Sequence, residues 1–105
     1  MTGEEKYEVR ESAIGLGLFA RASLVAGERV VEYLGERVPT PIADTRKTRF
    51  LFDLENGFTI DGEALSNTAR YVNHSCMPNC EAEIVGKQIF FNAVRDIFAD
   101  EELTI

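Results

Sequence analysis

The side chains best suited to chemistry crowd into residues 70–80, whose sequence is Arg-Tyr-Val-Asn-His-Ser-Cys-Met-Pro-Asn-Cys. Asn73 and His74 bring strong hydrogen-bonding capacity to this stretch. Taken alone, the residues leave three interpretations open. The Asn-His-Ser triplet is a glycosylation sequon if the protein is secreted. Alternatively, His74 with Cys76 and Cys80 forms part of a metal site, or His74 is a half-buried ring whose hydrogen bonds are satisfied.

The remaining composition bears on these alternatives. Met1–Lys6 is acidic and has neither the basic nor the apolar region of a secretory signal. An intracellular location is therefore expected, cytoplasmic in a bacterium and nuclear in a eukaryote. The cysteines are then expected to be reduced. Two cysteines and one histidine fall short of the four ligands of a closed zinc site, so no metal ion is expected.

Residues 70–80 resemble, at every position, the R-[FY]-[IV]-N-H-S-C-x-P-N-C signature of the SET-domain protein lysine methyltransferases. Three further blocks follow the order of that family. Residues 15–20 are similar to its G-x-G-[LV]-F-A motif, and residues 27–36 to its G-E-x-[IV]-x-E-Y-x-G-E motif. Residues 95–105 are similar to its R-D-I-x-x-G-E-E-L-[TF] stretch, with Asp100 in place of the usual glycine.

The resemblance implies a mainly β fold, a β-clip-like SET domain of small twisted sheets with one or two short helical turns. It also implies a function, the transfer of a methyl group from S-adenosyl-L-methionine to a lysine side chain of a protein. A chain of 105 residues fits one such domain, residues 1–105. Tyr33 is the residue expected to orient the lysine amine for catalysis.

The same resemblance assigns the cofactor-binding residues. Glycines allow the backbone to approach a ligand closely, because no Cβ intervenes. Taken alone, Gly15-Leu16-Gly17 is better explained as a plain turn, and Arg70 could equally be a surface ion-pair residue. The residues expected to bind S-adenosyl-L-methionine are Ile14, Gly15, Leu16, Gly17, Arg70, Asn73 and His74.

The sequence departs from the family at its C-terminal end. The family's other active-site tyrosine lies a little beyond the Glu-Glu-Leu-Thr stretch, whereas this sequence stops at Ile105. The expectation is a SET domain that lacks this tyrosine segment and any post-SET segment, and that transfers methyl groups very slowly or not at all. An unpaired strand edge at residues 103–105 is expected to favour a homodimer. Without a post-SET segment, Cys76 is expected to be a small buried group.

Two alternatives to an active enzyme remain open at this stage. One is a non-catalytic SET-fold module that binds cofactor or a basic peptide, and the other is an inert truncation product. Eighteen acidic and eleven basic residues give a formal charge of −7. This charge favours a basic, lysine-containing protein or peptide as partner and disfavours direct nucleic-acid binding, although acidity can also serve solubility alone. No apolar run reaches the about 20 residues needed to span a membrane.

The elements that must position these residues are read from turn signals and β-rich runs. Asn56-Gly57 is expected to supply the positive φ angles of a tight hairpin turn, and a second hairpin is expected around Gly86. Short helical turns are expected at residues 43–47 and 63–71. Strands are predicted at residues 7–10, 18–21, 29–34, 49–54, 58–60, 82–85 and 89–94.

Overall fold

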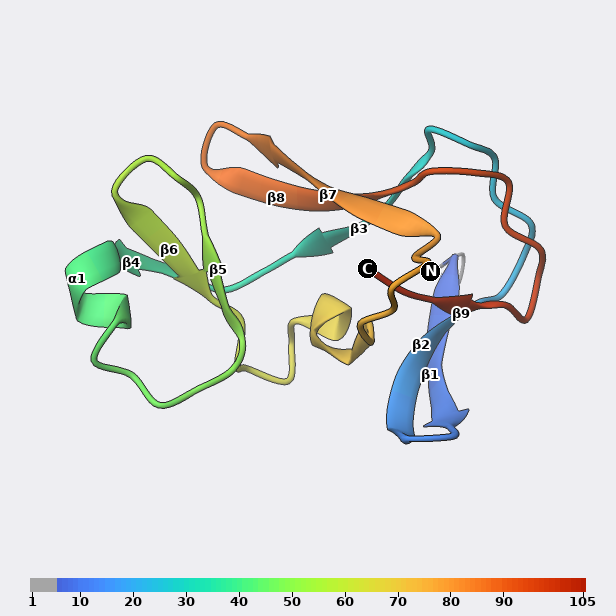
Figure 1. Ribbon diagram of the computed structural model, residues 1–105, viewed down its shortest axis with the longest axis horizontal. Helices are drawn as coiled ribbons and strands as arrows, with labels where there is room; N and C mark the ends of the chain where they lie inside the picture. The colour runs from blue at the N-terminus through green and yellow to red at the C-terminus, as the bar shows by residue number, and fades with distance from the viewer. Residues whose placement is uncertain (1–5) are drawn as a thin grey trace.

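Strands dominate the computed structural model, which describes residues 6–105 (Figure 1). The acidic N-terminal residues 1–5, which lack the features of a secretory signal, lie outside the described residues. In chain order the elements are β1 (Tyr7–Ser12), β2 (Gly15–Ala20), β3 (Arg29–Tyr33), β4 (Glu36–Pro39), α1 (Thr40–Ala43), β5 (Leu51–Asp53), β6 (Phe58–Asp61), the 3-10 helix η1 (Thr68–Tyr71), β7 (Cys80–Val85), β8 (Gln88–Ala93) and β9 (Glu102–Leu103).

The strands form three small antiparallel sheets. Their strand orders are β1-β2-β9, β3-β8-β7 and β4-β6-β5. In Figure 1 the sheet with β4 lies at one end of the molecule beside α1, the sheet with β1 lies at the other, and η1 lies between them. The predicted mainly β class is confirmed. None of the helices among the described residues is long and apolar enough to cross a membrane.

Each of the seven predicted strand runs overlaps a strand, and the hairpin around Gly86 joins β7 to β8. The strand β4 was not predicted, because its Glu-Arg-Val-Pro sequence does not alternate regularly between apolar and polar residues and ends in proline. Proline is tolerated there because β4 is an edge strand, where a backbone N–H need not join the ladder.

The hairpin between β5 and β6 is confirmed, but its turn differs from the prediction. Leu54 donates its N–H to the carbonyl oxygen of Phe58 at 2.9 Å, so the loop is longer than a two-residue turn. The positive φ angles belong to Glu55 and Gly57, at 64° and 92°, and not to Asn56. Asn56 acts through its side chain, which accepts a hydrogen bond from the Phe58 N–H at 3.1 Å.

The helical turns lie near their predicted positions, and only one of them within its predicted range. The 3-10 helix η1 forms the end of the expected 63–71 segment. The helix α1 ends at Ala43, where the predicted 43–47 turn begins, so that prediction was wrong except at this one residue. Pro41 lies at the start of α1, where its fixed φ favours helix and its missing N–H has no intrahelical role.

The predicted unpaired edge at residues 103–105 is wrong, and with it the argument for a homodimer through that edge. β9 pairs with β2 on one side. On the other side, the Cys80 N–H donates to the Thr104 carbonyl oxygen at 3.0 Å. The Ile105 N–H donates to the Asn73 carbonyl oxygen, also at 3.0 Å. These bonds fasten the segment after η1 to β9.

The core joins the three sheets. Leu18 of β2 and Leu103 of β9 are fully buried and lie opposite each other in register. An aromatic cluster links two other sheets, because Tyr33 and Phe91 come from β3 and β8 and Phe52 comes from β5. The ring centroids in this cluster lie 5.4 to 6.1 Å apart in tilted pairs, which is a favourable aromatic geometry.

Candidate active site

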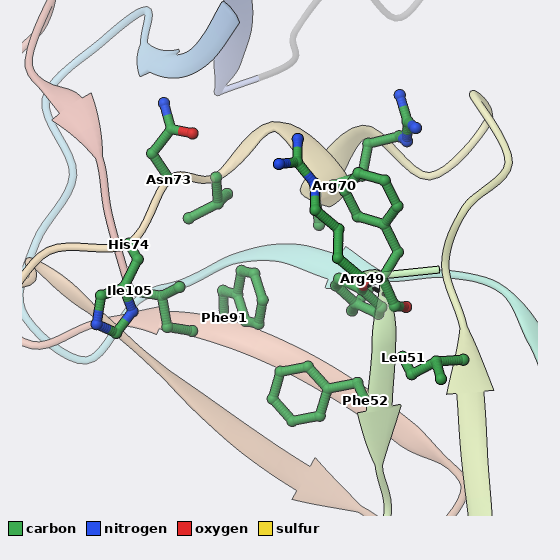
Figure 2. A pocket seen from close by; sticks show the side chains of 12 residues that line it. Arg49, Leu51, Phe52, Arg70, Asn73, His74, Phe91 and Ile105 are labelled. Atoms are coloured by element: carbon green, nitrogen blue, oxygen red, sulfur yellow. Dashed lines mark hydrogen bonds between the residues drawn. The ribbon is translucent and has the colours of Figure 1, made fainter. Parts of the chain in front are cut away.

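Two cavities meet at a common wall beside η1. Both are lined by Arg49, Phe50, Arg70 and Asn73, which we call the shared wall. The tyrosine cavity has a volume of about 410 Å³, and the hairpin cavity has a volume of about 470 Å³. Figure 2 shows the tyrosine cavity, with Phe52 and Phe91 on one side and Asn73 and Arg70 on another.

The cavities differ in the residues that complete them. Beyond the shared wall, the hairpin cavity is lined by Ile14, Gly15, Leu16 and Tyr71. Beyond the shared wall, the tyrosine cavity is lined by Tyr33, Leu51, Phe52, Ala69, Val72, His74, Phe91 and Ile105.

Tyr33 stands at the end of β3 with only 6% of its surface exposed. Its hydroxyl donates a hydrogen bond to the main-chain oxygen of Phe50 at 2.7 Å. Burial raises the pKa of Tyr33 to about 12, with a further increase from the negative charge of Asp61 and a decrease from Arg70. The hydroxyl therefore stays protonated at neutral pH. Because its proton is committed to Phe50, its oxygen lone pairs remain available to accept a hydrogen bond.

Two residues of the loop after β6, Gly62 and Asn67, shape the structure beside the Tyr33 ring. A Cβ at Gly62 would collide with the ring and with the Asn67 side chain, so only glycine fits there. Asn67 is fully buried, and its amide accepts from the Leu34 N–H and donates to the Gly62 oxygen, both at 2.9 Å. The sequence analysis missed Asn67, because a single asparagine in a loop carries no signal of burial.

The Asn73 side chain joins three parts of the chain. Its Nδ2 donates to the Leu16 carbonyl oxygen at 3.2 Å and to the Glu102 Oε2 at 2.8 Å. An amide nitrogen carries two hydrogens, so both are used. The Oδ1 is then the part of this side chain left for a ligand, and it can only accept a hydrogen bond.

The two glycines of the β2 turn are required for different reasons. Gly15 has a φ of 119°, which side-chain-bearing residues rarely adopt, and it lines the hairpin cavity. Gly17 is buried and lines neither cavity. A Cβ at Gly17 would lie 2.6 Å from the Glu102 Oε2. Gly17 therefore makes room for a carboxylate of the chain itself.

Arg70 and Arg49 give the shared wall a positive charge. The Arg70 guanidinium lies 4.3 Å from the centroid of the Phe50 ring, and that of Arg49 lies 5.1 Å from it. Among residues 6–105, Arg70 forms no ion pair, which disfavours its alternative reading as a surface ion-pair residue. Its Nε is buried and has no hydrogen-bond partner. A buried donor of this kind favours a ligand with an acceptor group.

His74 is exposed and lines the tyrosine cavity near Ile105 (Figure 2), so it is not placed with the glycine turn. Cys76 is exposed, and the expectation that it is buried is wrong. It lies in a projecting loop in which Met77 is 86% exposed. Cys80 is the buried cysteine, and burial raises the pKa of its thiol to about 11. No three potential metal ligands gather anywhere in the described part of the chain.

Of the residues predicted to bind cofactor, five line the hairpin cavity and two do not. Gly17 lines neither cavity, and His74 lines the tyrosine cavity. Sequence reasoning missed the phenylalanines of the tyrosine cavity, Phe50, Phe52 and Phe91, since their strand patterns indicate burial and nothing more. The five that line the hairpin cavity are Ile14, Gly15, Leu16, Arg70 and Asn73.

The described chain thus consists of three small sheets and two adjoining cavities, one lined by the buried Tyr33 and the other by the glycine turn. The family described as "SET domain" matches residues 15–105, and the chain belongs to this family. It is 40% identical over 84% of its length to "Histone-lysine N-methyltransferase, H3 lysine-4 specific" of Emericella nidulans. It is 39% identical, again over 84% of its length, to the protein of that name from Saccharomyces cerevisiae. The chain spans only 8% and 9% of these relatives.

Proposed function

We propose that this SET domain transfers a methyl group from S-adenosyl-L-methionine to the side-chain amine of a lysine in a protein. The observation that carries the proposal is the pair of cavities with one shared wall. Methyl transfer is an in-line displacement, so two ligands must approach each other from opposite sides. The names of the two relatives describe the same reaction class.

The hairpin cavity suits the cofactor by its chemistry. The open Oδ1 of Asn73 can accept from an ammonium or hydroxyl group, and the unpartnered Arg70 Nε can donate to a carboxylate. The side chains of Ile14 and Leu16 are 77% and 51% exposed, so they offer apolar surface to a ring of the bound cofactor. These residues, with Gly15, would hold the cofactor. When bound, S-adenosyl-L-methionine supplies a methyl group on a positively charged sulfur.

The tyrosine cavity suits a lysine side chain. A lysine amine has an ordinary pKa near 10.4, so deprotonating it at pH 7 costs roughly 4 to 5 kcal/mol. The rings of Phe52 and Phe91 give the cavity an apolar wall, and partial desolvation against that wall lowers the pKa of a lysine amine placed there. Tyr33 accepts one N–H of the amine and so fixes the direction of the nitrogen lone pair. The amine proton leaves to solvent, since Tyr33 remains protonated.

The proposed substrate is a basic protein segment such as a histone tail. The formal charge of −7 attracts cationic segments over distance, an effect that salt weakens. On this proposal the protein acts inside the cell, in the nucleus if its source is a eukaryote, and it does not bind nucleic acid directly. A basic peptide should bind more tightly than an acidic one of equal length, and the difference should shrink as salt is added.

The test is transfer of labelled methyl groups to a basic peptide that contains one lysine. Tyr33→Phe should lower kcat about a hundredfold, because one orienting hydrogen bond at the reacting group contributes roughly 3 kcal/mol. Tyr7→Phe is the matched control, since Tyr7 lines neither cavity. Undiminished transfer by Tyr33→Phe would contradict the mechanism. Binding of both ligands by the wild type without any transfer would instead identify a non-catalytic SET-fold module.

A further inference from the structure

Glu102 lies in β9, outside the walls of both cavities, and the reaction proposed above does not use it. Its backbone is held on two sides. It pairs with Phe19 of β2, and its carbonyl oxygen accepts a hydrogen bond from the Asn79 Nδ2 at 2.8 Å. Asn79 is itself buried. The Glu102 carboxylate is therefore attached to a backbone that has little freedom to move.

This carboxylate is directed at Asn73. The Glu102 Oε2 accepts one hydrogen of the Asn73 Nδ2 at 2.8 Å, and the Leu16 carbonyl oxygen accepts the other at 3.2 Å. Rotating the amide by half a turn would place the Oδ1 against these two acceptors, which would repel it. The two acceptors thus fix which end of the amide faces the cavities. In Figure 2 the amide oxygen of Asn73 is turned to the side where Arg70 lies, and the nitrogen is not.

The fit around the carboxylate is close. A Cβ at Gly17 would lie 2.6 Å from the Glu102 Oε2 and 3.2 Å from the Asn73 Nδ2. A side chain at residue 17 would therefore displace the very pair of groups that forms the hydrogen bond. The glycine of β2, the carboxylate of β9 and the amide after η1 form one packed unit.

We propose that Glu102 is a positioning residue for the cofactor. It holds the Asn73 amide so that the Oδ1 is presented to the hairpin cavity as an acceptor for a donor group of the ligand. The Leu16 oxygen alone is a weaker restraint, because it uses one hydrogen at a longer distance. This role rests on the proposed function, since it presumes that S-adenosyl-L-methionine occupies the hairpin cavity.

The experiment measures the affinity for S-adenosylhomocysteine, a non-reactive probe, by calorimetry at low temperature. Glu102→Ala and Glu102→Met remove the acceptor, and Glu102→Met also keeps the volume. Both should weaken binding about tenfold, the effect of losing one charge-assisted hydrogen bond. Glu102→Gln offers a neutral amide oxygen to Asn73 and should stay within about threefold of wild type. Glu101→Gln, whose carboxylate pairs with Arg95 away from both cavities, is the matched control and should not change affinity.

A second readout separates positioning from general stability. The two side-chain amide hydrogens of Asn73 should exchange slowly with solvent in the wild type and in Glu102→Gln, and faster in Glu102→Met, where one of them has lost its acceptor. Wild-type affinity in a folded Glu102→Met variant would overturn the inference. Equal weakening by Glu102→Gln and Glu102→Met would also overturn it, because the oxygen would then not be what matters. If the wild type itself fails to bind the probe, the proposed function fails first.

Discussion

Replacing Tyr33 by phenylalanine removes a hydroxyl whose environment sets a measurable pH dependence of stability. The hydroxyl donates to the Phe50 oxygen at 2.7 Å. Burial raises the pKa of Tyr33 from its ordinary value of 10.0 to about 12. At neutral pH, Tyr33→Phe should lower the free energy of unfolding by about 1 to 3 kcal/mol, because the half-buried Phe50 oxygen loses its donor.

At alkaline pH this difference should shrink. A tyrosine in the unfolded chain ionises near pH 10, whereas Tyr33 in the folded chain ionises near pH 12. The wild type therefore has its full stability below pH 10 and loses stability as the pH rises from 10 to 12. At 1.36 kcal/mol for each pKa unit, the loss approaches about 3 kcal/mol at the upper end. The phenylalanine variant has no such loss.

Urea unfolding followed by circular dichroism, from about pH 8 to about pH 11.5, measures the free energy of unfolding of the wild type and of Tyr33→Phe. The stability difference should fall by about 2 kcal/mol across this range. The buried Cys80 thiol, with its pKa raised to about 11, adds a loss above about pH 9 that is common to both proteins and cancels. A difference that stays constant with pH would show that Tyr33 is not protected from ionisation, and the reasoning about its environment would be refuted.

Three further results are expected. Gly62→Ala should lower the free energy of unfolding by several kcal/mol in a thermal or urea scan, because its Cβ has no space; a loss below about 1 kcal/mol would contradict the packing. Of the two thiols, Cys76 should react at once with a thiol reagent and Cys80 only on unfolding; equal rates would contradict this. Gly17→Ala should destabilise the wild type by about 1 to 3 kcal/mol and a Glu102→Ala background less; additive effects would show that these positions do not interact.

The sequence predicted the parts of the site whose residues are neighbours in the chain. Residues 70–80 and the glycine turn stand out as continuous motifs, and the structure brings Ile14, Leu16 and Asn73 to one cavity. Strands were likewise predictable, because β-branched and aromatic runs between turn residues are a local signal. The helix α1 was misplaced because the turn signal of two prolines hid the start of a helix.

Contacts made between distant elements could not be predicted. The Phe50 carbonyl oxygen faces Tyr33 only because β3 and β5 belong to sheets that pack together. The burial of Asn67 and the exposure of Cys76 depend on loop paths that no periodicity encodes. Asp100 was noted as a replacement for glycine, and its φ of 75° gives the reason why glycine suits that position.

The pairing of β9 with β2 affects how the protein folds during its synthesis on the ribosome. Leu18 of β2 pairs with Leu103 of β9, so β2 cannot complete its pairing until a strand much further along the chain is available. Closing so long a loop is slow, and folds built on such distant pairings fold more slowly than those built on local ones. The nascent chain leaves the edge of β2 and the side chain of Leu18 uncovered until β9 emerges, and during that interval it is open to chaperones and to aggregation.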